Sequence, residues 1–544
     1  MRQINAIIDQ LVSIRNRYGK GSAAEKLRLL AGIDTRAVKS KHVASSLYSA
    51  LLFLLAYPDN KTVHKAADKL LTELENSIRI HEVLNYSLYN TGITGTTLCA
   101  AFSFEMIKWL RKTRPADIKF NSFEAGNAQV QSILSVVMSK TESEIMQDAN
   151  EDWKSWLKQI KEPGQELLDQ FIAIFDSSDI RPEVKEELWN TIGINVEINF
   201  SSQCRLPDSL TKLHYHSSLV HKPTSEYKIK KPVRVALSNT EAEQLVDCTR
   251  MILLRKLREL DPISFSSAKL VSLYHLERGM SIALIGMVPA HRHPIDSYMG
   301  YLVFKNGLPV AYAGSWILFD SARIGLNVFA DYRGGEAKYI FDQVLQLHEK
   351  VYHLKRFTVD PYQVGKHNSD GISSGVFWVY YQAGFRPIEK EQLQLAENEA
   401  GKIKADHNYR SSAAVLNTLS NSRLELVLQK GAVRFDATDI SRLYATLLSK
   451  NYKTRQIEKQ AAQRLATMLG IKNYQGENIS FVLKNWGILL LAGEKELQSN
   501  AGLRRTVKEL VNLKAGGSEE LYISGLQKAV ELRRFIEELI KKYK

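Results

Sequence analysis

The sequence predicts a multidomain α/β protein. A central mixed, mainly antiparallel sheet with flanking helices is expected between an α-helical N-terminal domain and a mostly helical C-terminal domain. The chain has 544 residues, more than one hydrophobic core usually supports, so about two to four domains are expected. Apolar residues recur at helical spacing before about residue 200 and after about 396, whereas strand-like and helix-like segments alternate between them.

The predicted domains are an α-helical domain at 1–204, a linker or surface arm at 205–232, an α/β domain at 233–395 and a basic, mostly helical accessory domain at 396–544. In the first domain, Lys61–Arg79 follows a Pro-Asp-Asn turn and carries apolar residues three and four positions apart, as one face of a helix requires. Glu144–Lys161 and Gly164–Phe175 repeat this pattern, while Val196–Phe200 alternates like a short strand.

The arm at 205–232 is rich in Pro, Ser, His and Lys. Its histidines, His214, His216 and His221, have no paired thiolate or carboxylate nearby in the sequence, so we expect surface residues and no metal. The three cysteines are far apart and form no CxxC pair, which favours a reducing, cytoplasmic compartment. The N-terminus lacks the apolar core of a signal peptide, and no apolar run is long enough to span a membrane.

The middle domain alternates strands and helices. Ser238 and Glu241 have the spacing of a capping box ahead of a helix at Glu241–Leu260. Asn306-Gly307 is the dipeptide that turns a tight hairpin. The predicted strands are Val233–Leu237, Ser281–Val288, Tyr298–Lys305, Leu308–Trp316, Arg323–Phe329, Arg356–Val359 and Phe385–Ile388, and the further helices are Ala337–Leu354 and Ile372–Ala383.

The last block, 396–544, holds 25 Lys and Arg against 16 Asp and Glu, a net of +9 out of +14 for the whole chain. A basic surface favours nucleic acid or another acidic partner, although charges of mixed sign also suit plain solvated helix faces. Helices are predicted at Asp439–Lys450, Arg455–Leu469, Gly502–Leu513 and Ser524–Tyr543, with possible short strands at Arg423–Leu428 and Ile479–Leu483. The oligomeric state is left open by the sequence.

The first motif with chemical meaning is the segment from Asn327 to Ala337, NVFADYRGGEA. A strand enters an Arg/Gly loop at the start of a helix. The free N–H groups and positive dipole of a first helical turn attract phosphate. Glycines let the main chain approach such a ligand, and Arg333 adds charge-assisted hydrogen bonds. The alternative is a glycine turn that only starts the helix.

The second motif runs from Ser373 to Pro387 and places Tyr380 four residues before Gly384-Phe385 on a short aromatic helix. A phenol can donate a proton when its pKa is tuned by the site. Tyr381 is the adjacent alternative, and packing in the core is the competing explanation for both rings.

The order of elements and both motifs resemble the GNAT (N-acetyltransferase-like) acyltransferase superfamily between about residues 230 and 395. The resemblance implies transfer of an acyl group from acetyl-CoA or another acyl-CoA to an amine or hydroxyl, with Tyr380 protonating the leaving thiolate. It also implies that the cofactor is held by Asn327, Val328, Phe329, Arg333, Gly334, Gly335, Glu336 and Ala337. The loop departs from the family pattern, Arg-x-x-Gly-x-Ala/Gly, by one missing residue, and Glu336 adds a negative charge.

A general base is not evident in the sequence. Asp360, just after the strand Arg356–Val359, and His367 in the following loop are the candidates, acting through water. Asp360 has the alternative role of capping a turn before Pro361. The sequence contains no P-loop, HExxH or GxGxxG motif. Two other functions stay open: a transferase that uses an aminoacyl-tRNA donor, and a non-catalytic scaffold or binding protein with the same fold.

Overall fold

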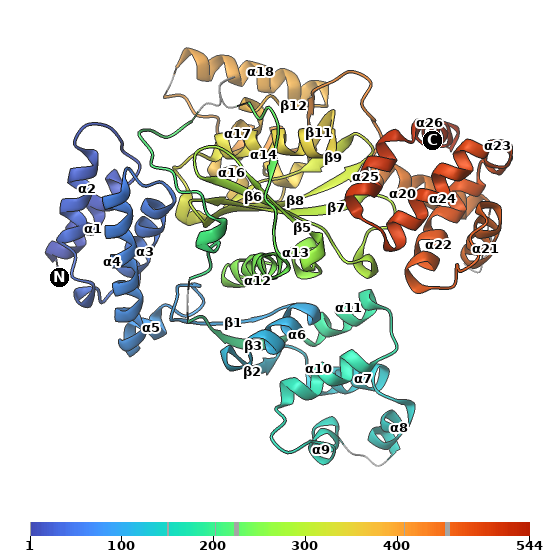
Figure 1. The fold of residues 1–544 in the computed structure, drawn as a ribbon, viewed down its shortest axis with the longest axis horizontal. Helices are drawn as coiled ribbons and strands as arrows, with labels where there is room; N and C mark the ends of the chain where they lie inside the picture. Colours follow the sequence, from blue (N-terminus) through green and yellow to red (C-terminus); the bar gives the residue numbers. More distant parts are fainter. Residues whose placement is uncertain are drawn as a thin grey trace.

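The computed structural model describes residues 2–148, 152–201, 203–221, 228–406, 408–451 and 457–543. It is a multidomain α/β protein in which the central sheet lies between two helical blocks (Figure 1). The N-terminal helices lie at one end of this sheet, the C-terminal helices at the other, and a small second sheet lies below (Figure 1). No described helix has the length and apolar character needed to cross a bilayer.

The N-terminal block is a helical bundle whose sequence pattern explains its packing. Asn60 starts α4 by accepting hydrogen bonds from the main-chain N–H groups of Thr62 and Val63. The apolar face of α4, including Leu70 and Leu74, is buried against α3. The helices are α1 (Arg2–Ile14), α2 (Ser22–Ala31), α3 (Lys41–Ala56), α4 (Lys61–Ile80) and α5 (Glu82–Ser87).

The expectation of one α-helical domain over 1–204 needs correction, because residues 97–199 build a separate unit around a three-stranded antiparallel sheet in the order β1-β3-β2. The alternation at Val196–Phe200 does mark a strand, β3 (Ile194–Asn199). Its partners are short and partly exposed, so they give no clear apolar pattern: β1 (Thr97–Ala101) and β2 (Ile118–Phe123). The helices are α6 (Phe104–Thr113), α7 (Asn127–Val137), α8 (Lys140–Asp148), α9 (Trp153–Gln159), α10 (Leu167–Ser177) and α11 (Pro182–Ile192).

Residues 203–221 and 228–232, the described part of the predicted arm, contain little regular structure and hold the N-terminal block onto the central sheet. Residues 222–227 of that prediction lie outside the described ranges. The main-chain N–H of His216 donates to the carbonyl of Pro58 over 2.7 Å, and Asn306 of the sheet donates to the carbonyl of Ala56 over 3.0 Å. The predicted hairpin at Asn306-Gly307 is therefore also a docking point.

The central sheet has the order β12-β13-β11-β9-β8-β7-β6-β5-β4, with β10 paired to β8. Only β9 and β11 run parallel among the described neighbours, so the predicted mixed, mainly antiparallel sheet is confirmed. The strands are β4 (Val233–Arg234), β5 (Val271–His275), β6 (Met280–Ile285), β7 (Ser297–Lys305), β8 (Leu308–Leu318), β9 (Ser321–Ile324), β10 (Asn327–Val328), β11 (Arg356–Val359), β12 (Arg386–Pro387) and β13 (Leu424–Val427).

Helices cover both faces of this sheet. The predicted capping box is confirmed, since Ser238 and Glu241 exchange hydrogen bonds at the start of α12. The helices are α12 (Asn239–Arg255), α13 (Asp261–Ser264), α14 (Ala337–Tyr352), α15 (Pro361–Val364), α16 (Ser369–Ser374), α17 (Val376–Gln382), α18 (Lys390–Ala405) and α19 (Ala413–Leu419).

One domain boundary and two strand assignments differ from the prediction. Strand β13 inserts between β11 and β12, so the central domain continues past 395 to about residue 427. Strand β5 was not predicted, and the possible strand at Ile479–Leu483 is wrong because these residues lie within helix α22. Residues 455 and 456 of one predicted helix lie outside the described ranges.

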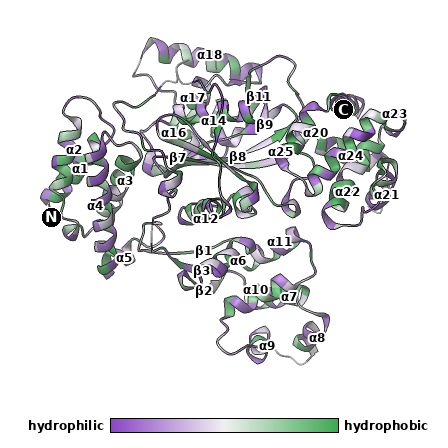
Figure 2. Ribbon diagram, viewed as in Figure 1, coloured by the Kyte–Doolittle hydropathy of each residue, from purple (hydrophilic) through white to green (hydrophobic). Residues whose placement is uncertain are grey.

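The C-terminal block is a bundle whose helices carry both hydrophobic and hydrophilic residues (Figure 2). It docks through a buried network in which Arg292, in the loop after β6, pairs with Glu519 at 3.1 Å, and Lys514 donates to the carbonyl of Asp296 over 2.8 Å. The helices are α20 (Ala437–Asn451), α21 (Ile457–Leu469), α22 (Glu477–Leu491), α23 (Glu494–Ser499), α24 (Ala501–Gly516), α25 (Glu519–Lys528) and α26 (Val530–Tyr543).

Candidate active site

The central sheet divides between its two parallel strands. Strands β9 and β11 pair at three positions, the last being Arg323 with Thr358. After Ile324, Gly325 and Leu326 form no ladder pairs, and β10 then continues along β8 in the same register as β9. Among the described residues, the edge of β10 away from β8 forms no ladder. We call this interruption of the ladder, between β10 and the end of β11, the split.

The side chain of Tyr380, on α17, is 1% exposed and lies behind the split. The rings of Phe341 and Phe385 hold it, with centroids 5.2 and 5.9 Å away. Its hydroxyl lies toward the main chain of Leu326, yet it completes no hydrogen bond of normal geometry with any residue the structure describes. Burial raises the pKa of Tyr380 above its usual value, and the main chain of Leu326 opposes this only in part. The group therefore stays a proton donor at neutral pH.

Two further groups contact Gly325. The hydroxyl of Tyr301 donates to the carbonyl of Gly325. The amide of Gln363 from α15 lies so close that a Cβ on Gly325 would come 3.0 Å from its Oε1 atom. The glycine thus lets a polar side chain approach the main chain between β9 and β10, a contact that the sequence does not indicate.

The two predicted base candidates occupy different environments. Asp360, immediately after β11, pairs with Arg323 at 3.1 Å and with Arg423 at 3.6 Å and is about one-third exposed. His367 is exposed in the loop between α15 and α16, in a left-handed conformation with φ 57°. No described contact joins Asp360, His367 and Tyr380 into one hydrogen-bonded group.

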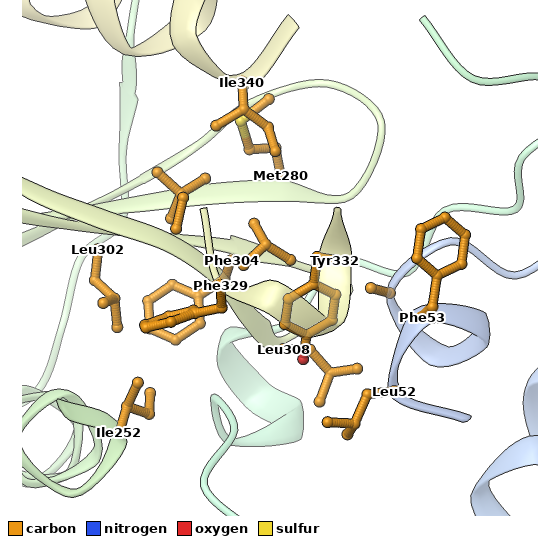
Figure 3. Close-up of a cluster of buried hydrophobic side chains, with 14 of the residues drawn as sticks. Leu52, Phe53, Ile252, Met280, Leu302, Phe304, Leu308, Phe329, Tyr332 and Ile340 are labelled. Atoms are coloured by element: carbon orange, nitrogen blue, oxygen red, sulfur yellow. The ribbon is translucent and has the colours of Figure 1, made fainter. Parts of the chain in front are cut away.

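The segment from Asn327 to Tyr332 turns away from the split and packs against the N-terminal bundle. Asn327 is exposed, Val328 is half-buried and Phe329 stacks on Tyr312 with ring centroids 5.2 Å apart. Tyr332 is buried, and Figure 3 shows it between the strands of the sheet and Leu52 of α3. The strand that was predicted to deliver an open phosphate loop therefore leads into an interdomain contact.

The start of α14 is closed by protein. Tyr57 of the N-terminal bundle lies over Gly335, where a Cβ would come 2.9 Å from its ring. The hydroxyl of Tyr57 faces the main-chain amide of Glu336. Arg15 also donates to the carbonyl of Arg333 over 3.3 Å. Gly335 and Glu336 are buried, Ala337 is half-buried, and only Arg333 and Gly334 remain exposed.

The expectation for Glu336 needs correction, because its carboxylate is fully buried in an ion cluster and does not point toward a ligand. It accepts hydrogen bonds from Lys305 at 2.8 Å, from Arg278 at 2.5 Å and from the main-chain N–H of Val220 at 2.9 Å. Although burial acts to raise it, Lys305 and Arg278 hold the pKa of Glu336 below its usual value. Burial in turn lowers the pKa of Lys305 to about 8, opposed by Glu336.

Sequence reasoning missed the two cations of this cluster. Lys305 ends an otherwise apolar strand just before Asn306-Gly307, and Arg278 lies in the turn between β5 and β6 with φ 59°. For Lys305 the sequence does contain a signal. A single charged residue at the end of an apolar strand indicates a buried ion pair, since buried charges are paired. For Arg278 no signal is evident.

The sequence also contains a Gly-x-Ser-x-Gly spacing at residues 371–375, the pattern of a serine hydrolase nucleophile. That chemistry requires the serine on a sharp turn between a strand and a helix. Ser373 instead lies within helix α16, is exposed, and donates to the carbonyl of Asp370. The local structure therefore does not support a nucleophile here.

Among the residues that the structure describes, there is no group of three or more His, Cys, Asp or Glu side chains that could hold a metal ion. The three cysteines are free thiols. Comparison of the chain with protein-family models, with curated proteins and with solved structures finds no match.

Proposed function

We propose that this chain transfers an aminoacyl group from an aminoacyl-tRNA to an amine acceptor, with the ester carbonyl lying in the split between β10 and β11. The observation that carries this is a contrast between two places. The ladder between the parallel strands ends beside a buried tyrosine hydroxyl that lacks a hydrogen-bond partner among the described residues, whereas the start of α14 is closed by Tyr57 and Glu336. The strand order and Tyr380 support a GNAT-like group-transfer domain, and the closed helix start favours a donor other than coenzyme A.

The closed turn matters because coenzyme A needs donors for its pyrophosphate. A helix start binds phosphate through free N–H groups and unneutralised positive charge. Here the carboxylate of Glu336 already pairs with both Lys305 and Arg278 and offsets one of their two positive charges. A second, larger anion beside this buried carboxylate would meet repulsion in a region of low dielectric. An aminoacyl-tRNA needs no pyrophosphate at this position.

The basicity of the leaving group also favours an aminoacyl ester over a thioester as the donor. Attack of the amine nitrogen on the carbonyl carbon breaks the bond to the leaving atom, which then takes a proton. A thiolate is a weak base, since a free thiol has a pKa of about 8.5. A phenol with a pKa raised above its usual value of about 10 would not protonate it readily. The ribose alkoxide released from an aminoacyl ester is far more basic, so Tyr380 is suited to that partner.

The proton of the attacking amine needs a second acceptor. Asp360 is the carboxylate that the end of β11 provides, and it forms ion pairs with Arg323 and Arg423. It would take the proton through a water molecule, as the sequence analysis expects of Asp360 or His367. The main chain at Gly325 and Leu326, which lies outside the ladder with β11, would face the carbonyl oxygen as negative charge develops.

The proposal is tested with radiolabelled aminoacyl-tRNA and a mixture of amino acids and short peptides as acceptors. Label should move from tRNA to an acceptor, and the rate should fall steeply with added salt because phosphate contacts are screened. Stable aminoacyl-tRNA in the presence of the protein and every acceptor would overturn it.

Acyl-CoA is the second candidate donor, because Arg333 and Gly334 remain exposed at the mouth of the loop. Calorimetric titration with acetyl-CoA separates the two. Binding at micromolar concentration would favour the thioester. Absence of both coenzyme A binding and aminoacyl transfer would leave the non-catalytic scaffold as the function of this domain.

A further inference from the structure

Helices α15 and α17 pack against each other beside the split. Helix α15 follows β11 directly, and α17 directs Tyr380 toward Leu326. On α15, Tyr362 is 59% exposed although its neighbour Gln363 is packed against Gly325. A large aromatic ring is thus held in solvent one residue away from the candidate site.

Helix α17 carries two more rings, and a cation from β12 lies beside one of them. The guanidinium of Arg386 lies 3.9 Å from the ring centroid of Tyr381. Tyr381 in turn meets Trp378 edge-on, with centroids 5.2 Å apart. Both aromatic side chains are half-buried. We call these three residues, together with the exposed Tyr362 of the adjoining helix α15, the aromatic platform.

One donor of the aromatic platform lacks a hydrogen-bond partner among the described residues, and its cation lacks a paired carboxylate there. The indole N–H of Trp378 forms no hydrogen bond with any described residue, although buried donors usually find one. Arg386 donates to the main-chain carbonyls of Tyr381 and Phe385, and no described carboxylate pairs with it. Its positive charge is therefore available to an anionic ligand.

Aromatic faces interleaved with cations are the surface that unpaired nucleotides recognise. Bases stack on aromatic rings and arginine planes, while the phosphates follow the positive charge. We infer that the aromatic platform stacks the single-stranded 3′ nucleotides of an RNA. This deepens the proposed function, because it names where the nucleotide end of the donor would bind next to the split. The role of the bound RNA rests on the proposed function, but RNA binding itself can be tested without any assay of aminoacyl transfer.

The test is fluorescence anisotropy with a labelled hairpin RNA that ends in a single-stranded CCA, compared with the same hairpin made blunt-ended. The full-length protein should bind the CCA-ended hairpin more tightly. Tyr362→Ala should weaken that binding about tenfold, and Arg386→Gln should weaken it and reduce its dependence on salt. Tyr362→Phe should restore binding because a phenylalanine ring still stacks.

The chain provides a matched control in Tyr86 of α5, which is 82% exposed and belongs to the N-terminal bundle. Tyr86→Ala should leave RNA binding unchanged. The inference is overturned if the blunt hairpin binds equally well, or if Tyr362→Ala binds as tightly as Tyr86→Ala.

Failure of this inference and failure of the proposed function are distinguishable. If RNA binding depends on Tyr362 but no aminoacyl transfer is detected, the RNA-binding inference is supported and the proposed transferase function is contradicted. If aminoacyl transfer is detected and Tyr362→Ala changes neither its rate nor its Michaelis constant, the proposed function is supported and the RNA-binding inference is contradicted.

Discussion

The ammonium group of Lys305 lies 2.8 Å from the carboxylate of Glu336, and both side chains are fully buried. The pair joins the end of β7 to the start of α14, and Arg278, at 2.5 Å, is a second cation on the same carboxylate. Removing one member of such a group leaves an uncompensated charge in the buried interior, which costs far more than the intact pair contributes.

Replacement of Glu336 by glutamine should therefore destabilise the protein strongly. Two cations would be left facing a neutral amide, and we expect a loss of about 3 to 5 kcal/mol in the free energy of unfolding. Urea denaturation followed by tryptophan fluorescence measures it. The control is Glu144→Gln, which breaks the exposed pair with Lys140 and should change stability by less than about 0.5 kcal/mol. Equal effects of the two substitutions would show that the buried cluster is not formed.

Glu186 should make the stability depend on pH. Burial raises its pKa to about 7, although the N–H groups of Phe104 and Glu105 that it accepts from act to lower it. In the unfolded chain its pKa is about 4.3. Between these values the folded protein keeps a proton that the unfolded chain has released, so stability falls as pH rises through this interval.

Urea unfolding at pH 5, 6, 7 and 8 should show this loss, on the order of 1 to 3 kcal/mol in total. Glu186→Gln should remove it, because an amide does not titrate over this range. The difference between the wild-type and variant curves isolates this residue from the other carboxylates. A variant curve parallel to the wild type would contradict the assignment.

Much of the central sheet follows from its sequence. Apolar runs bounded by turn residues located β6, β7, β8 and β11, since buried strands are short and continuous in apolar character. Strand β13 joins the same sheet only after α18 and α19, and no local pattern indicates which strands it will pair with. Strand β1, with the sequence Thr-Leu-Cys-Ala-Ala, lacks the alternation that would reveal it.

The candidate site was predictable only in its local parts. The short aromatic helix with Tyr380 and the glycine loop before α14 were located from the sequence together with its resemblance to the GNAT superfamily. The closure of that loop depends on Tyr57, which belongs to another domain and comes close only in the folded chain. The burial of Glu336 depends likewise on Lys305 and Arg278 from two separate turns. Contacts between distant segments carry no local signal.

Gly307→Ala should cost more stability than Gly375→Ala. Both glycines have positive φ, 80° and 63°, so a side chain strains either main chain by about 1 kcal/mol or more. A Cβ on Gly307 would also come 2.7 Å from the hydroxyl of Thr211, whereas one on Gly375 meets nothing within 4 Å. Urea midpoints of the two variants compare them directly. A larger loss at Gly375 would contradict the packing of the arm against the β7–β8 hairpin.

Tyr380→Phe should separate catalysis from stability. The hydroxyl completes no normal hydrogen bond with a described residue, so its removal deletes no interaction that stabilises the fold. We expect the free energy of unfolding to change by less than about 0.5 kcal/mol or to rise slightly. If Tyr380 protonates the leaving group, the rate of aminoacyl transfer should fall by about 100-fold or more, within the range typical of general acid catalysis.

Tyr352→Phe is the matched control for this substitution. Tyr352 ends α14, is also buried, and its hydroxyl likewise has no hydrogen-bond partner among the described residues. The pKa of Tyr352 is raised by the same burial, so the two hydroxyls differ mainly in position. Tyr352→Phe should leave both stability and transfer unchanged. If both variants keep full transfer activity, Tyr380 is a packing residue and the leaving oxygen takes its proton from water or another group. If both lose activity, burial of a polar hydroxyl, and not its place behind the split, explains the effect.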